Sequence, residues 1–136
     1  MDVGKTVGID YEVRKLSGWL LAFAVAEYAS GREVRLDRAC GKFPFKFVEV
    51  VAIPVKGEGG APDYIKYEEI CSCFTNDDFL RILKQSGIQA REVGIMFSTK
   101  VDGFPPFESI DRYEAMGRAL VARCAKSEIV TVPEFL

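Results

Sequence analysis

The residue types that carry most enzyme chemistry are sparse in this chain. It contains no histidine, the usual general base at neutral pH and the commonest ligand of transition metals. Nucleophilic schemes that pair serine or cysteine with histidine are therefore excluded, as are mixed cysteine–histidine zinc sites. We predict that the protein is not an enzyme, uses no cofactor and holds no metal ion. A small enzyme with a histidine-free site remains an alternative.

Four cysteines are the other candidates for metal or redox chemistry, and they are Cys40, Cys71, Cys73 and Cys124. Cys71 and Cys73 have C-x-C spacing, whereas zinc knuckles and thioredoxin-like sites use C-x-x-C. A four-cysteine zinc site would need Cys40 and Cys124 to converge on this pair. We expect reduced thiols instead, with Cys124 packed in the core as a small apolar residue.

Two groups of carboxylates form the candidate partner-binding surface, namely Asp77, Asp78, Glu108, Asp111 and Glu114. The first two open an amphipathic segment, where acidic residues favour the positive end of a helix dipole. The other three are spaced by three residues, which predicts one exposed helix face. Catalysis by paired carboxylates would need a convergence of partners that this spacing does not supply.

Residues 42–47, KFPFKF, alternate basic and aromatic side chains. This pattern is typical of platforms that stack single-stranded nucleic-acid bases, and also of a strand whose phenylalanines pack against a helix. We favour the second interpretation. Because the net charge is −2 and no basic stripe is present, we do not expect direct nucleic-acid binding.

The elements expected to position these groups follow from hydrophobic periodicity and turn residues. The expected strands cover residues 9–13, 43–55, 64–71, 88–99 and 129–132, with a glycine-rich hairpin loop at 57–62. The expected helices cover 19–28, the segment from Thr75 to Gly87, and the segment from Ser109 to Cys124. Because helices and strands do not alternate strictly, we predict an α+β fold with three helices packed on a small mixed, mostly antiparallel sheet.

Three burial predictions accompany these elements. The first helix is apolar on nearly all sides, so it should be the most buried, with Ser17 as its cap and Gly31 as its stop. On the strand over 43–55, one parity should be buried, and it comprises Phe43, Phe45, Phe47, Val51, Ile53 and Val55. The last helix should bury a stripe of Ile110, Tyr113, Gly117, Leu120, Val121 and Cys124.

Size and composition indicate a single α+β domain over residues 1–136, with residues 1–8 flexible. The chain has 49% apolar and 28% charged residues, an ordinary globular balance. Its longest apolar run, residues 19–26, is well short of the roughly 20 residues that span a membrane. The first residues do not resemble a secretory leader. We therefore expect a cytoplasmic protein with no membrane association.

Segments near the two ends resemble a small uncharacterised family of phage and prophage proteins. Residues 13–26, VRKLSGWLLAFAVA, resemble its opening strand and helix, and residues 114–123, EAMGRALVAR, with 128–133, EIVTVP, resemble its closing helix and end. Residues 74–79, FTNDDF, lack the proline and tryptophan of the family's middle segment. The resemblance implies a phage context, a compact α+β fold and the host cytoplasm, and supplies no activity, catalytic residue or cofactor.

We therefore expect a phage accessory protein that acts by binding a host or phage protein. Its specific form would be inhibition of a host defence system, in the manner of an anti-CRISPR protein. The alternative from another class is a binder of small molecules or signalling nucleotides. Its pocket would carry Arg112, Arg118 and Arg123 if a dimer joined two copies of the last helix.

Overall fold

The computed structural model describes residues 8–134, and it has the expected α+β fold. The predicted flexible segment over residues 1–8 lies outside the described residues except for Gly8, which begins a strand. The helices are α1 (Gly18–Ala29), α2 (Asn76–Ser86) and α3 (Arg112–Ala125), with one 3-10 turn, η1 (Val13–Lys15). The strands are β1 (Gly8–Glu12), β2 (Glu33–Leu36), β3 (Phe45–Val55), β4 (Tyr64–Cys73), β5 (Arg91–Val93), β6 (Met96–Thr99), β7 (Phe107–Ser109) and β8 (Ile129–Pro133).

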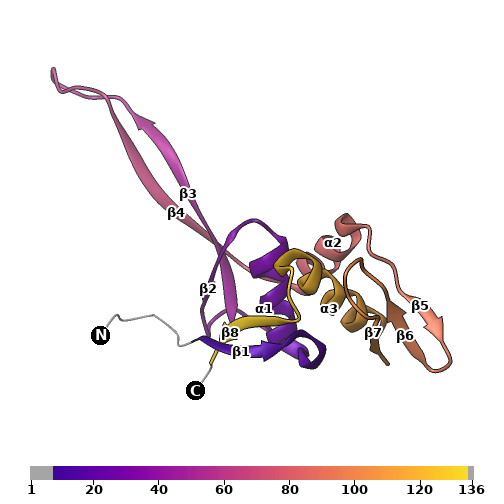
Figure 1. Cartoon of the computed structure of the whole chain (residues 1–136). Helices are drawn as coiled ribbons and strands as arrows, with labels where there is room; N and C mark the ends of the chain where they lie inside the picture. The colour runs from indigo at the N-terminus through magenta and orange to yellow at the C-terminus, as the bar shows by residue number, and fades with distance from the viewer. Residues whose placement is uncertain (1–7, 135–136) are drawn as a thin grey trace.

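The described strands form three small sheets, where we had expected one mixed sheet. Their orders are β1–β8, β2–β3–β4 and β5–β6–β7, and every pairing given by the registers is antiparallel. Figure 1 shows the sheets arranged around the helices, with the two ends of the described chain joined side by side as β1 and β8. The helices, rather than one continuous sheet, therefore hold the body together.

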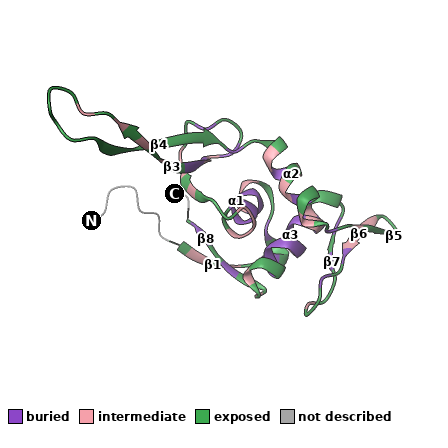
Figure 2. Ribbon diagram, turned by 90° about the horizontal axis from the view of Figure 1, so that it is seen from above, coloured by how far each residue is buried: buried purple, intermediate pink, exposed green. Residues whose placement is uncertain are grey.

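Helix α1 is the centre of the core, as its composition predicts. Residues 21–26 are buried without a break, because α2 and α3 pack on it and β8 and β2 contact it from other sides. Figure 2 shows this buried helix in the middle of the molecule. Ser17 occupies the capping position, but its side chain makes no capping hydrogen bond, so that detail of the prediction is wrong.

A cluster of phenylalanines joins β3 to this core. The ring centroid of Phe45 lies 5.5 Å from that of Phe23 on α1 and 4.8 Å from that of Phe74. Phe43 and Phe47 are buried beside them. The predicted burial of these phenylalanines is confirmed, so their rings are not available to stack bases. The strand itself begins at Phe45 rather than at the predicted Phe43.

Helices α2 and α3 begin with local caps. Thr75 and Asp78 form a reciprocal capping box at α2, as the acidic first turn indicated. Helix α3 begins at Arg112 rather than Ser109, because Asp111 caps it by accepting a hydrogen bond from the Glu114 backbone N–H at 2.9 Å.

The predicted apolar stripe of α3 is correct for Gly117, Leu120 and Val121, which are buried. It is wrong for the exposed Ile110 and Tyr113. Ile110 precedes the helix, so helical spacing does not place its side chain. Cys124, in the last turn, is also exposed, so the prediction that it packs in the core is wrong.

The single strand expected over residues 88–99 is a hairpin. Strands β5 and β6 pair with Val93 opposite Met96, so the chain reverses over Gly94 and Ile95. Gly94 has φ 63°, a conformation that glycine adopts without strain and that tight hairpin turns require. Strand β6 then pairs with β7, an element that the sequence did not suggest.

Strands β3 and β4 extend beyond the body as a long hairpin (Figure 1). They pair without interruption from Lys46–Cys73 to Val55–Tyr64, whereas β2 covers the other edge of β3 only as far as Val48. We call residues 49–70 the arm. The hairpin loop predicted at 57–62 is confirmed. The predicted burial of Val51, Ile53 and Val55 is wrong: they are only partly buried, because no helix covers this part of the sheet.

Candidate functional site

The two faces of the arm differ in charge. Residues that lie opposite one another in an antiparallel pair project from the same face. The face that continues from Phe47 carries Glu49, Lys66 and Glu68 among its apolar residues. Beyond the Val50–Glu69 pair, the paired residues of the other face carry no charged side chain. We call this surface the charge-free face, and it consists of Val50, Ala52, Pro54, Ile65 and Tyr67.

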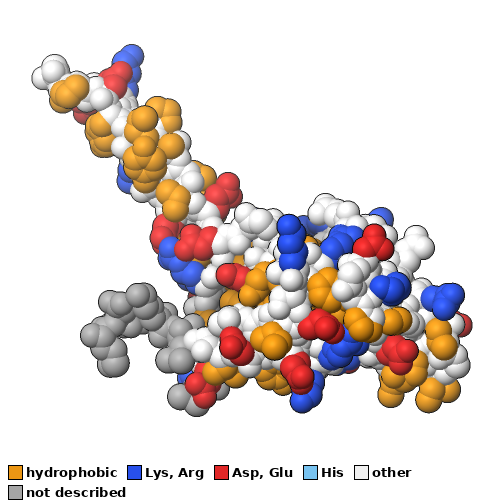
Figure 3. All heavy atoms as spheres, in the orientation of Figure 1, with side chains coloured by type: hydrophobic (Ala, Val, Ile, Leu, Met, Phe, Trp, Pro, Cys, Tyr) orange, Lys and Arg blue, Asp and Glu red, His pale blue; other side chains and the backbone are white. Residues whose placement is uncertain are grey.

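Apolar side chains on this face are open to solvent. Tyr67 is 67% exposed, Ile65 57% and Val50 55%. Figure 3 shows hydrophobic side chains gathered along the arm, away from the body. A two-stranded hairpin is at best marginally stable alone in water, and contiguous exposed apolar surface is typical of interaction sites. The arm is therefore the strongest candidate for a functional surface.

Polar contacts fix the base of the arm. Arg35 on β2 bonds both carboxylate oxygens of Glu69, at 3.0 and 3.2 Å, and Nε of Arg35 bonds Glu33 at 3.0 Å. Lys46 lies 3.3 Å from the carboxylate of Asp37. These contacts position the arm relative to the body, although their members are largely at the surface.

A disulfide also fixes the base, which corrects the expectation of four reduced thiols. Cys40, in the loop after β2, is bonded to Cys73 at the end of β4, and their Cα atoms are 5.3 Å apart. The 33-residue separation gives no sequence signal for this pairing, which depends on the loop folding back onto β4. Cys71 and Cys124 are free and exposed.

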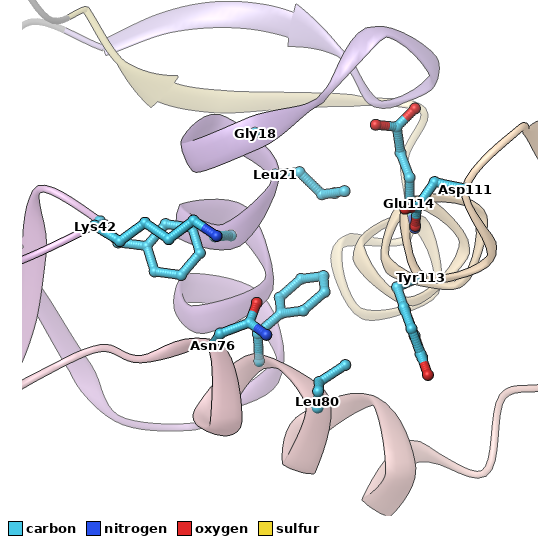
Figure 4. Close-up of a pocket in the computed structure, with 11 residues that line it drawn as sticks. Gly18, Leu21, Lys42, Asn76, Leu80, Asp111, Tyr113 and Glu114 are labelled. Atoms are coloured by element: carbon cyan, nitrogen blue, oxygen red, sulfur yellow. The ribbon is translucent and has the colours of Figure 1, made fainter.

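A pocket of about 380 Å³ lies among the three helices (Figure 4). Its apolar lining includes Leu21, Phe79 and Leu80, and its polar rim includes Lys42 and Asn76. This volume is within the range of small-molecule sites. Lys42 and Asn76 lie on one side of the pocket, and the predicted site residues Asp111 and Glu114 lie together on the other, at the start of α3 (Figure 4).

The structure brings together three of the five predicted surface carboxylates. Glu108, Asp111 and Glu114 line one shallow depression with Arg118. They do not share a helix face, because Glu108 lies in β7 and Asp111 is the cap of α3. Glu114 accepts a hydrogen bond from Ser109 at 2.9 Å and pairs with Arg118 at 2.8 Å, so its charge is balanced within the chain.

The other two carboxylates lie apart, at the start of α2. Asp78 belongs to the capping box and also pairs with Arg81 at 3.2 Å. Asp77 is exposed in the same turn. The structure therefore does not unite the five residues into one acidic surface.

The arginines expected to line a nucleotide pocket each have contacts within the chain. Arg118 donates to the backbone carbonyls of Leu16 at 2.8 Å and of Glu108 at 3.2 Å. Arg123 donates to the carbonyl of Ser86 at 3.2 Å, and Arg112 lies over the ring of Phe97 at 5.0 Å. A nucleotide would have to compete with these contacts.

Residues 8–134 contain no group of three or more cysteine, aspartate or glutamate side chains placed to hold a metal ion. None of their helices is long and apolar enough to cross a membrane.

Sequence reasoning missed the arm as a site, although a signal was present. Strands of ten or more residues joined by a glycine-rich loop are long for this body, and both parities of β3 and β4 contain apolar residues.

Comparison of the chain with protein-family models, curated proteins and solved structures found no match.

Proposed function

We propose that this protein acts by binding another protein, and that the arm is its principal contact. The observation that carries the proposal is the charge-free face, where Val50, Ile65 and Tyr67 are each more than half exposed. Covering these side chains would remove apolar surface from water, which is the main favourable term in most protein association.

The charges of the arm favour a protein over a nucleic acid. Its cationic side chains are Lys56 and Lys66, and Lys66 lies 2.8 Å from the carboxylate of Glu68. Nucleic-acid binding draws its affinity from several cations that neutralise phosphates. An uncharged face instead suits a partner with an apolar surface, because a charged partner group would lose water there without gaining a counter-charge.

The shape of the arm favours a partner with a recess. The outer part of one face measures about 20 by 10 Å from strand rise and strand spacing. That is well below the roughly 800 Å² per partner of a stable interface. A flat partner would cover one face only, whereas a recess that receives the arm would also cover Val51, Ile53 and Val55 on the second face.

The finer form of the proposal comes from the resemblance of the chain ends to phage proteins. In that setting the partner is a host protein, and blocking a component of a defence complex is the role that we propose. Asp77 and Glu108, both exposed, are candidates for peripheral contacts.

Site-specific photocrosslinking tests the proposal. A benzoylphenylalanine at Tyr67 should form an adduct with one host protein in lysate, and the same group at Ile110, an exposed site off the arm, should not. Equal labelling from both positions, or none from Tyr67, would contradict the proposal.

The captured protein is then purified and its affinity measured by calorimetry. The pair Ile65→Ser and Tyr67→Ser should weaken binding at least about tenfold, because exposed aromatic and aliphatic anchors dominate such interfaces. The matched pair Ile110→Ser and Ile129→Ser, which removes exposed apolar residues elsewhere, should change binding less than about twofold. The reverse ranking would assign the interface to the body.

A further inference from the structure

In the described part of the chain, no strand lies beside the outer edge of β4. Strand β4 is the last in the order β2–β3–β4, and no other described strand pairs with it. All ten of its residues are exposed, none is proline, and its register with β3 is continuous. Such an edge presents unpaired N–H and C=O groups, which form a template for another strand.

The opposite edge of the hairpin is less suited to pairing. Strand β2 already occupies β3 from Phe45 to Val48. The outer part of β3 contains Pro54, which has no backbone N–H to donate. Strand β4 is therefore the edge on which an added strand could pair without interruption.

We propose that two copies of this chain pair antiparallel along the outer edges of β4, about a two-fold axis that passes beside Tyr67. Such an axis stands perpendicular to the sheet, so each face of one arm continues as the same face of the other. Each residue then lies opposite the residue of the second copy that is equally distant from Tyr67 along the strand.

On the charged face of the arm this register is complementary in charge and in apolar character, while on the other face it sets Ile65 opposite Glu69. Lys66 lies opposite Glu68 of the second copy, and Glu68 opposite its Lys66, both on the charged face of the arm. Tyr64 lies opposite Ile70 on that face, and the two Tyr67 side chains meet on the charge-free face. Opposite charges and aromatic pairs directly across an antiparallel ladder are stabilising.

Neighbouring symmetric registers lack this match. An axis beside Lys66, Glu68 or Glu69 sets a charged side chain against its own copy, which is destabilising. An axis beside Ile70 places Glu68 opposite Ser72 and leaves Lys66 opposite no residue of β4. Only the centre at Tyr67 sets Lys66 opposite Glu68, and this self-complementary pattern favours a second copy over an unrelated extended segment.

The pairing deepens the proposed function and rests on the arm being an interaction element. It uses the strand edge and leaves both faces open, so two charge-free faces would join into one broader surface around the Tyr67 pair. Tyr67 belongs to both surfaces, so Val50→Ser on β3, away from the β4 edge, and the charge exchange at Lys66 and Glu68 are the variants that separate partner binding from self-pairing.

Charge exchange tests the pairing in the full-length chain, with light scattering and sedimentation equilibrium as the measurements. The wild type should be a dimer, and Lys66→Glu or Glu68→Lys alone should weaken it at least about tenfold, because each sets like charges opposite one another twice. The combination of both substitutions should restore dimerisation. Lys15→Glu, which breaks the exposed pair with Glu12, is the matched control and should leave the dimer intact.

Engineered cysteines test the register. In a background of Cys71→Ser and Cys124→Ser, Tyr67→Cys should form an intermolecular disulfide on mild oxidation, because directly opposite Cα atoms lie within disulfide range. Ile65→Cys, which lies opposite Glu69, should crosslink far less.

Three outcomes would overturn the inference. The first is a wild type that stays monomeric at about 100 μM, a concentration that would populate even a weak dimer. The second is a dimer that is insensitive to both single charge substitutions. The third is a double exchange that fails to restore dimerisation although circular dichroism shows a folded chain. Loss of self-association with retained, face-dependent binding of a host protein would leave the proposed function standing alone.

Discussion

Arg35 on β2 and Glu69 on β4 form a two-point ion pair across the strand that separates them, with N–O distances of 3.0 and 3.2 Å. Glu69 lies opposite Val50 on β3, and no paired residue farther out along this face of the arm is charged. This pair therefore marks the boundary between the part of the sheet that the body holds in place and the part that projects into solvent.

Arg35→Ala should loosen the arm without unfolding the body. Exposed ion pairs contribute little to global stability, so the melting temperature should change little. Amide hydrogen exchange in residues 64–70 should become faster, because Glu69 loses its contact with β2. Arg81→Ala, which removes an exposed pair with Asp78 on α2, is the control. Unchanged exchange in β4 would show that the ion pair does not hold the arm.

Removal of the disulfide at the same base should have a larger effect. Cys40→Ser should lower the free energy of unfolding by about 2–4 kcal/mol, because the crosslink no longer restricts the unfolded chain. Urea denaturation measures this change, and reducing the wild type should reproduce it. Cys71→Ser removes a free, exposed thiol and should leave stability unchanged. Equal stability of the oxidised wild type and Cys40→Ser would contradict the prediction.

The helices could be predicted from the sequence because their determinants are local. Thr75 and Asp78 are three residues apart and cap α2 by themselves, and an apolar run such as residues 21–26 is buried on whichever side neighbours pack. The start of α3 was predicted at Ser109 and lies at Arg112, because Asp111 accepts the hydrogen bond from the Glu114 backbone N–H and so caps the helix.

The arm and the disulfide could not be predicted from the sequence. The arm depends on where the covering helices end, and the disulfide depends on a contact between residues far apart in the sequence. Val51 and Ile53 follow the same alternation as the buried Phe45 and Phe47, and only the end of the covering layer distinguishes them. The pairing of Cys40 with Cys73 depends on the path of a loop. The alternation of apolar residues along a strand predicts which side chains share a face. Whether that face is buried depends on how far the packed helices extend along it.

The stability of the arm's base should depend on pH through Asp37. A hydrogen bond from the backbone N–H of Ala39, at 2.9 Å, and the nearby Lys46 lower the pKa of Asp37 below its ordinary 3.8. The carboxylate therefore stabilises the fold above the unfolded-state pKa, and this contribution is lost as pH falls through the lower folded-state value.

Asp37→Asn tests that dependence. Near pH 7 the free energy of unfolding of the variant should be lower than that of the wild type. At about pH 3 this difference should be smaller, because the unfolded wild type binds a proton at Asp37 and the charged carboxylate no longer contributes its full stabilisation. Urea denaturation at both pH values measures the difference. Asp102→Asn, an exposed carboxylate in a turn outside the helices, is the control. A difference that grows toward low pH would have the wrong sign for a lowered pKa.

Gly117 on α3 sets the closeness of the three helices. A Cβ at this position would lie 3.3 Å from Leu21 on α1 and 3.4 Å from Phe79 on α2, which is tight but involves flexible side-chain ends. Gly117→Ala should be close to neutral, because about 1 kcal/mol of helix propensity offsets the crowding. Gly117→Val should lower the free energy of unfolding by about 1–3 kcal/mol, because its extra methyl groups overpack the junction. Chemical denaturation ranks the three proteins, and a valine variant as stable as the alanine variant would show that the helices can separate without cost.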